Sequence, residues 1–306
     1  MCHEFTFRSA DGKTDLHAAE WIPQGRKVRA VLQISHGVAE YILRYADLAQ
    51  LLTDQGIAVV GHDHLGHGDS VAPGAPRLYF GPKGSWSWLV EDLYTRRSMA
   101  KKRFPGVPYF LLGHSMGSFL ARTYLIRYPG TVDGAILMGT AWQPTLALRA
   151  GRRIAGAEVA RIGEKEPSPR LEKLVFGGCV KQFPTGPLDW LSASADNVRE
   201  YEADPLCGGT PTAGLFRELL GGLLFNEQEE NLKKMNLNTP VLFLSGEDDP
   251  VGSMGKGVRR SYEAFQRAGV REVDLKLYPG LRHEILNEEE SGQVAGDLLQ
   301  WLEHHL

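Results

Sequence analysis

A serine between two glycines is the residue of this chain best suited to nucleophilic chemistry. Gly113-His114-Ser115-Met116-Gly117 directly follows an apolar run, 109–112, and directly precedes a segment with helical spacing, 116–128. A tight turn from strand to helix would strain the serine backbone and project its hydroxyl above the sheet. The amide of Met116, at the start of the helix, would then be free to bind an oxyanion. We therefore predict that Ser115 is a catalytic nucleophile.

A serine nucleophile needs a base, and the base needs a carboxylate that orients it. Behind a strand–turn–helix serine these partners follow in the order acid, then histidine, each after a later strand. His283 follows the apolar run 273–278 and is predicted to be the base. For the acid, Asp249 is preferred because Pro250 restricts it to an extended backbone, and Asp248 and Glu247 are the alternatives.

The loop after the first apolar strand is expected to complete the oxyanion site. In Ser35-His36-Gly37-Val38 the backbone N–H of Val38 could point toward the same oxygen as the amide of Met116, although a His-Gly pair is also common in plain turns. His36, Gly37 and His114 flank these groups. We predict that these three residues contact the substrate.

A histidine-rich loop invites a metal-binding hypothesis. Three histidines and two aspartates lie between His62 and Asp69, within the glycine-rich segment 61–70. Their short spacings lack the i, i+4 arrangement of a helical zinc motif, and no distant fourth ligand is evident. A hydrogen-bonded loop that forms one wall of the site is the favoured interpretation.

The elements that must position these residues alternate between strand and helix. Short apolar runs at 30–35, 57–60, 109–112, 135–138, 241–244 and 273–278 predict buried strands, and helical spacing at 41–55, 86–104, 116–128, 258–268 and 293–302 predicts helices between them. Parallel neighbours need such crossovers. We therefore predict an α/β fold with a mostly parallel sheet and helices on both faces.

The alternation stops between residues 142 and 238, where helical fragments are broken by prolines and glycine pairs. Because the pattern then resumes, we predict one core, residues 1–141 and 239–306, with a helical cap (lid), 142–238, inserted over the active site. Apolar helix faces at 171–176 and 215–225 could line an acyl tunnel or could pack the cap onto the core.

Composition and charge give no sign of a nucleic-acid-binding protein. The chain has 306 residues, 42% of them hydrophobic, and 34 basic against 37 acidic residues give a net charge of −3. No dense basic run appears, so a nucleic-acid partner is not expected. The three cysteines, Cys2, Cys179 and Cys207, are widely spaced. The sequence shows no apolar leader and no apolar stretch long enough to span a membrane. Together with the spacing of the cysteines, this predicts a cytoplasmic protein with reduced thiols.

Five motifs together resemble the monoacylglycerol lipase and lysophospholipase branch of the α/β-hydrolases. They are His36-Gly-Val-Ala-Glu-Tyr-Ile-Leu-Arg44-Tyr, Gly61-His-Asp-His-Leu-Gly-His-Gly68, Gly113-His-Ser-Met-Gly117, Ser245-Gly-Glu-Asp-Asp-Pro250 and Tyr278-Pro-Gly-Leu-Arg-His283. The resemblance implies an eight-stranded sheet, a helical cap after the sixth strand, and the triad Ser115, Asp249 and His283. It also implies that Val38 and Met116 supply the oxyanion amides and that no metal or organic cofactor takes part. Ser118 departs from the glycine that many relatives carry.

These observations predict a serine hydrolase that cleaves esters of single-chain lipids, such as monoacylglycerols and lysophospholipids. Partial exposure of an apolar cap face would allow transient contact with a membrane surface. A short-chain or aryl-ester esterase with the same triad is the alternative. An aminopeptidase would need an acidic cluster for the substrate amine, for which only Glu227, Glu229 and Glu230 are dense enough. A non-catalytic binding protein is disfavoured because all three triad positions are filled.

Overall fold

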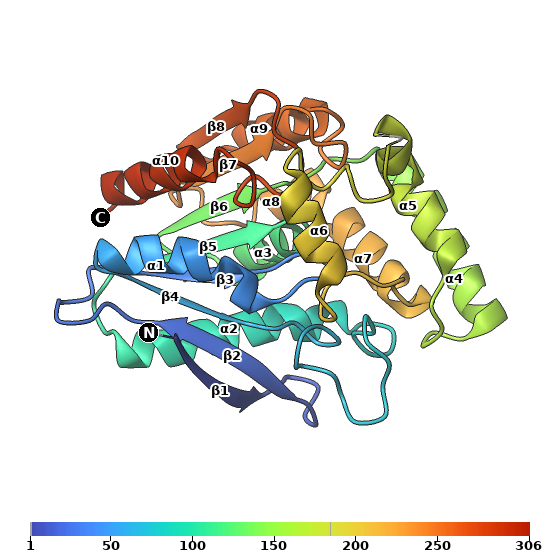
Figure 1. Cartoon of the computed structure of the whole chain (residues 1–306), viewed down its shortest axis with the longest axis horizontal. Coiled ribbons are helices and arrows are strands. Elements are labelled where there is room, and N and C mark those ends of the chain that lie inside the picture. Colours follow the sequence, from blue (N-terminus) through green and yellow to red (C-terminus); the bar gives the residue numbers. More distant parts are fainter. Residues whose placement is uncertain (1, 184) are drawn as a thin grey trace.

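The computed structural model describes residues 2–183 and 185–306. Within them, eight strands form one sheet in the order β1-β2-β4-β3-β5-β6-β7-β8 (Figure 1). The strands are β1 (Cys2–Arg8), β2 (Asp15–Trp21), β3 (Ala30–Ser35), β4 (Ile57–His62), β5 (Tyr109–His114), β6 (Gly134–Met138), β7 (Val241–Gly246) and β8 (Val273–Tyr278). β2 runs antiparallel to both of its neighbours, and all other pairs are parallel. The predicted eight-stranded, mostly parallel sheet is confirmed.

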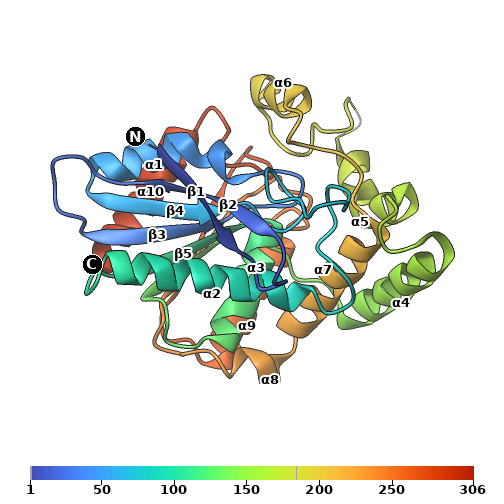
Figure 2. The ribbon, with the colours of Figure 1, turned by 90° about the horizontal axis from the view of Figure 1, so that it is seen from below.

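Helices cover both faces of the sheet. α1 (Ala46–Asp54) and α10 (Ser291–His304) lie on one face, and α2 (Trp86–Arg103), α3 (Met116–Arg127) and α9 (Lys256–Ala268) on the other (Figure 2). Alternation along the strands supplies both cores: Leu32 and Ile34 pack with the α1 and α10 side, whereas Val31 packs with the opposite side. The nearly continuous apolar runs of the central strands follow from this burial on both faces.

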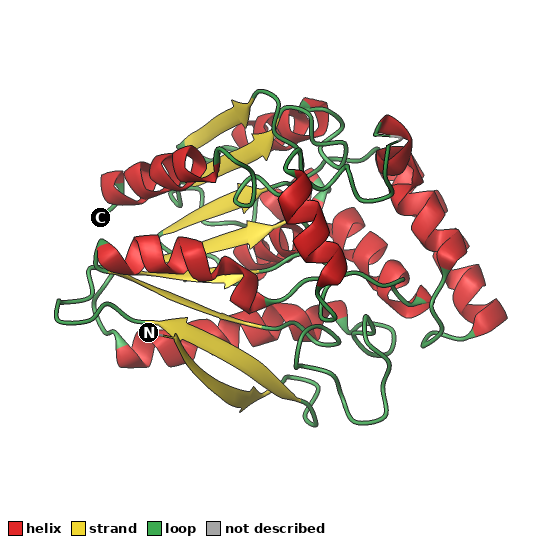
Figure 3. Ribbon diagram, viewed as in Figure 1, coloured by secondary structure: helices red, strands yellow, loops and turns green. Residues whose placement is uncertain are grey.

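The segment between β6 and β7 is helical, as Figure 3 shows. It contains α4 (Thr145–Ile162), α5 (Pro169–Gln182), α6 (Ala195–Ala203), α7 (Ala213–Asn226) and the short α8 (Glu229–Leu232). Three of these helices are preceded by an N-cap residue whose hydroxyl accepts a backbone N–H of the first turn. The N-cap residues are Ser168, Ser194 and Thr212. In Figure 1, α4–α7 lie beyond the carboxyl ends of the parallel strands. We call residues 142–238 the insertion.

The structure differs from the predicted secondary structure in two respects. β1 and β2 form an antiparallel pair that no apolar run marks, because β1 is largely exposed. The helical segment expected at 41–55 divides into a 3₁₀ turn, η1 (Ile42–Tyr45), and α1, and the Asp63 carboxylate accepts the Ile42 N–H at 2.8 Å at the start of that turn. No helix in the described parts of the chain combines the length and apolar character needed to cross a bilayer.

Candidate active site

Ser115 lies between β5 and α3 in a strained backbone conformation. Its φ of 52° and ψ of −122° fall in a region that non-glycine residues rarely adopt. The flanking glycines permit this turn, because a Cβ on Gly117 would overlap the backbone of Ser35 and one on Gly113 would overlap the backbone at Gly117. The Ser118 hydroxyl donates to the Ser115 carbonyl at 2.6 Å, so the departure at position 118 adds a bond to the turn.

The structure brings Ser115, His283 and Asp249 together. The Ser115 Oγ lies 2.9 Å from His283 Nε2, and His283 Nδ1 lies 3.0 Å from Asp249 Oδ2. All three side chains are buried, Asp249 completely. The other Asp249 oxygen accepts the Val251 N–H at 2.8 Å, which fixes the carboxylate. This line of hydrogen bonds can pass a proton from the hydroxyl to the imidazole and stabilise the resulting imidazolium.

The two other acids after β7 lie outside this line. Asp249 is the acid whose carboxylate reaches His283, whereas Glu247 is exposed and Asp248 is half-buried. The backbone N–H of Asp249 donates to the Gly246 carbonyl at 3.3 Å, so the chain turns inward directly after the strand. The structure therefore favours Asp249 among the three alternatives.

The loop between β3 and η1 lies against the serine. Val38 and Met116 both line a cavity that also contains Ser115. The Glu40 carboxylate fixes the loop by accepting the Gly37 N–H at 2.5 Å, and Ala39 adopts a φ of 60°. Tyr201 of the insertion donates to the Ala39 carbonyl at 2.9 Å. Amides held in this way can bind a developing oxyanion without rearranging.

Two of the three predicted substrate contacts line a cavity. Gly37 and His114 do so, but His36 is fully buried behind them. Both ring nitrogens of His36 are bonded to backbone: Nδ1 donates to the Gly37 carbonyl at 2.8 Å, and Nε2 accepts the His64 N–H at 2.9 Å. We therefore assign His36 to support of the loop and not to contact with substrate.

The histidine-rich loop lies under the β3 loop, and none of its residues lines either of the cavities that contain Ser115. The predicted wall is therefore wrong: the loop lies behind the wall and supports it through the His64 N–H, which His36 accepts. Asp63 and Asp69 do approach His17, with ligand atoms within 4.8 Å. However, the hydrogen bond that His17 donates to Asp63 raises the pKa of His17 to about 9, so His17 is ion-paired with this carboxylate at neutral pH.

A buried charge network beside the triad was not predicted from the sequence. His114 Nδ1 donates to Glu40 at 2.9 Å and its Nε2 donates to the His283 carbonyl at 3.3 Å. Burial alone would lower the pKa of His114, but the hydrogen bond and charge of Glu40 raise it above its ordinary value. An imidazolium with an acceptor at each nitrogen thus joins the β3 loop to the backbone of His283.

The same network fastens the insertion to the core. Arg44 binds both oxygens of Glu284, at 2.7 and 2.8 Å, and Glu284 also accepts the side-chain amide of Asn197 on α6 at 2.9 Å. The Arg44 guanidinium lies over the ring of Tyr201, 5.0 Å from its centroid. His283, the loop at 37–40 and α6 are therefore held as one unit.

Two cavities of different character meet at Ser115. One, of about 500 Å³, is lined mainly by apolar side chains from α3, α4, α5 and α7, including Phe119, Leu148 and Leu223. The other, of about 250 Å³, carries polar groups including Glu40, His114 and Thr210. Ser115, Val38 and Phe176 line both. The arrangement suits a molecule with one long apolar arm and one compact polar arm.

The acidic cluster that an aminopeptidase would require lies away from both cavities. Glu227, Glu229 and Glu230 line neither of them. Glu227 is buried, where it accepts the Gln143 N–H, and burial raises its pKa to about 7. Glu229 pairs with Arg267 at 3.3 Å. The cluster is therefore not available to a substrate amine beside Ser115.

Comparison with known proteins gives a consistent result. The model of the family described as "Serine aminopeptidase, S33" matches residues 26–290. A monoacylglycerol lipase of Mycolicibacterium smegmatis is 32% identical over 94% of this chain and 92% of its own length, and the human monoglyceride lipase is 27% identical over 96% and 88%. A thermostable carboxyl esterase of Bacillus coagulans superimposes with a TM-score of 0.92 at 27% identity, covering 99% and 98% of the two chains. The chain therefore belongs to this serine aminopeptidase S33 family and is a carboxylic ester hydrolase of the monoacylglycerol lipase type, with the α/β-hydrolase fold.

Proposed function

We propose that this ester hydrolase cleaves esters of single-chain lipids, such as monoacylglycerols and lysophospholipids. The observation that carries the proposal is the position of Ser115, whose hydroxyl is bonded to His283 where a long apolar cavity meets a small polar one. The acyl chain would occupy the apolar cavity and the alcohol would occupy the polar cavity. The relatives that are monoacylglycerol and monoglyceride lipases support a substrate with a single acyl chain.

The proposed reaction has two stages. His283 removes the proton of Ser115 as its Oγ attacks the ester carbonyl, and the Asp249 carboxylate stabilises the imidazolium that forms. The amides of Val38 and Met116 bind the oxyanion. His283 then protonates the leaving alcohol, and a water molecule activated by the same imidazole releases the fatty acid from Ser115. No step requires a metal or an organic cofactor.

We propose further that the insertion, residues 142–238, acts as the cap that admits substrate from a lipid surface. Leu146, Ile154 and Leu174, on α4 and α5, are exposed by 77%, 37% and 51%. Ile154 and Leu174 also line the apolar cavity, so this exposed face continues into it. Exposed arginines at 149, 152 and 153 lie on the same helix as Leu146 and would favour anionic headgroups.

A cytoplasmic location is part of the proposal, and the three free cysteines support it.

Cosedimentation with anionic vesicles tests the cap surface. Leu174→Glu is expected to reduce the bound fraction severalfold, because a charge would replace an apolar contact. Leu306→Glu changes an exposed leucine outside the insertion and is the control. Equal binding by wild type and Leu174→Glu would remove this surface from the proposal.

Labelling followed by a chain-length series tests the chemistry and the substrate. An active-site fluorophosphonate should label wild type and not Ser115→Ala, and equal labelling would disprove the mechanism. Each methylene that enters the apolar cavity should raise kcat/KM about fourfold, since burying it contributes about 0.8 kcal/mol. A peak at C2–C4 with no turnover of monoacylglycerol would identify a short-chain esterase instead. Hydrolysis of amino-acid anilides in preference to esters would identify an aminopeptidase.

A pair of glycine variants on α5 tests which cavity holds the acyl chain. Gly178 lines the apolar cavity, and a Cβ there meets no atom within 4 Å. Gly178→Phe should therefore fill the cavity and shift the optimum toward shorter chains. Gly177 lines neither cavity that contains Ser115, so Gly177→Phe is the matched control. An unchanged chain-length profile in Gly178→Phe would show that the acyl chain lies elsewhere.

A further inference from the structure

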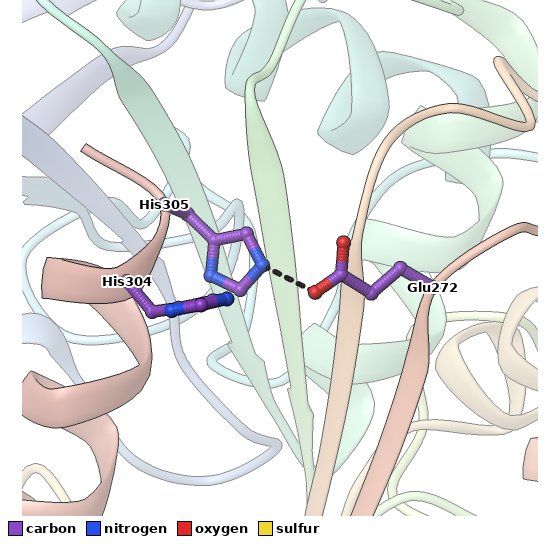
Figure 4. Close-up of side chains that lie close together, drawn as sticks. All are labelled: Glu272, His304 and His305. Atoms are coloured by element: carbon purple, nitrogen blue, oxygen red, sulfur yellow. Dashed lines mark hydrogen bonds and ion pairs between the residues drawn. The ribbon is translucent and has the colours of Figure 1, made fainter.

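The groove at the far edge of the sheet holds a second group of chemically capable side chains. It has a volume of about 730 Å³ and lies between the start of β8 and the end of α10. Glu272, just before β8, faces His304 and His305 at the end of α10, and a hydrogen bond joins Glu272 to His305 (Figure 4). One ligand atom from each of the three side chains lies within 4.8 Å of the others. The ester hydrolase function described above uses none of them.

Trp301 fixes the orientation of His305. The Nδ1 of His305 donates to the Trp301 carbonyl at 2.7 Å, and the two rings pack with centroids 4.2 Å apart. Trp301 is itself anchored, because its Nε1 donates to Asp274 on β8 at 2.9 Å. The remaining nitrogen, Nε2, therefore points to Glu272 Oε1, 2.9 Å away. Metal-bound histidines commonly donate one ring N–H to a backbone carbonyl, as Nδ1 of His305 does here, and Nε2 is then the nitrogen that would bind an ion in place of its hydrogen bond to Glu272.

The surroundings favour a cation. The helix dipole places partial negative charge at the end of α10, beside His304 and His305. Four carboxylates line the groove, those of Glu272, Asp274, Asp297 and Glu303. Asp297 is bonded to Lys276 at 2.5 Å and Glu303 pairs with Arg29 at 3.4 Å, which leaves Glu272 and Asp274 with no lysine or arginine partner among the described residues. A carboxylate and an imidazole that share an ion at about 2.0–2.2 Å from each ligand atom lie about 3 Å apart, close to the spacing of Glu272 and His305. The ring of His304 stands at 85° to that of His305, with centroids 5.0 Å apart.

We propose that Glu272, His304 and His305 bind one divalent transition-metal cation, for which Zn²⁺ is the natural probe. Two imidazoles and one carboxylate suit zinc and its neighbours better than Mg²⁺ or Ca²⁺, and water completes the coordination. The ion bridges the edge strand and the last helix and takes no part in ester hydrolysis. Glu272 precedes β8 while His283 follows it, so the six-residue strand, about 20 Å long, separates the two sites.

Calorimetry on the 306-residue chain without any affinity tag tests this proposal. At pH 7.5, Zn²⁺ should bind with a stoichiometry of one and raise Tm in a saturable manner, whereas Mg²⁺ should do neither. His304→Gln, His305→Gln and Glu272→Gln should each weaken Zn²⁺ binding at least tenfold. Lowering the pH to 5.5 should also weaken it, because protons compete for the imidazoles.

A matched control separates a built site from a simple ion pair. An exposed His3 pairs with the buried Glu20, 3.1 Å away, and no third ligand atom accompanies them in the described parts of the chain. His3→Gln should therefore leave Zn²⁺ affinity unchanged, and Zn²⁺ should leave kcat of the wild type unchanged. Absence of saturable binding up to 1 mM Zn²⁺ would overturn the proposal. Equal affinity in His305→Gln and the wild type would overturn it as well.

Discussion

His62 makes the stability of this protein depend on pH in a way that one substitution can isolate. It ends β4, is fully buried, and neither ring nitrogen has a hydrogen-bond partner among the described residues. The ring meets the edge of Phe7, with centroids 5.3 Å apart. Burial, together with the nearby His36, lowers the pKa of His62 from 6.5 to about 3. Leucine at this position would keep an apolar contact and remove the titration.

The sign and size of the effect follow from proton binding to the two states. As the pH falls through 6.5, the unfolded chain takes up a proton at His62, while the folded chain stays neutral until about pH 3. The contribution of neutral His62 is therefore complete above pH 6.5 and is lost progressively between 6.5 and 3. From pH 7.5 to 5.5 this loss is about 1 kcal/mol for one histidine.

Urea unfolding at the two pH values measures this difference. The free energy of unfolding should fall between pH 7.5 and 5.5 by about 1 kcal/mol less in His62→Leu than in the wild type. Any constant cost of repacking cancels, because each variant is compared with itself. Parallel pH dependences for wild type and His62→Leu would refute the reasoning.

Three further substitutions test the turn, the charge network and the triad. Gly117→Ala should destabilise the fold by about 3 kcal/mol or more in urea, since the new methyl meets the backbone of Ser35; an unchanged midpoint would contradict this packing. Glu284→Gln should cost about 3 kcal/mol because it leaves the buried Arg44 short of a charged partner, and full stability would show that the pair contributes nothing. Asp249→Asn should lower kcat for any ester by about 10⁴-fold while fluorescence reports an intact fold, and near-normal kcat would rule out its orienting role.

The parts of the fold that a local pattern encodes could be predicted from the sequence. The central strands are buried on both faces and are read directly as apolar runs, and the glycines at 113 and 117 mark the turn that holds Ser115. β1 and β2 could not be read in this way, because one of them is largely exposed and has no such run. Only the likeness to a family implied the two additional strands.

The residues that hold the site in place could not be predicted from local sequence patterns. Arg44 and Glu284 are 240 positions apart in the chain, and their pairing depends on how α6 and the β8 loop meet the core. The position of His36 in the predicted oxyanion loop favours contact with the substrate. The direction of its ring, however, depends on the His64 amide, 28 residues away. Types and order of residues thus predicted three side chains that lie together in the structure, Ser115, Asp249 and His283, while the groups that orient them could not be predicted in this way.

The junction of two cavities at Ser115 also bears on what replaces the alcohol. In the proposed mechanism the alcohol departs while the acyl chain remains in its apolar cavity, which vacates about 250 Å³ on the polar side. Water entering that space gives a free acid, but a second small alcohol entering it gives a new ester. Under this mechanism, water and a second alcohol are competing acceptors of the same acyl group. The ratio of the two products should follow the concentration of competing alcohols and the fit of each to the polar side.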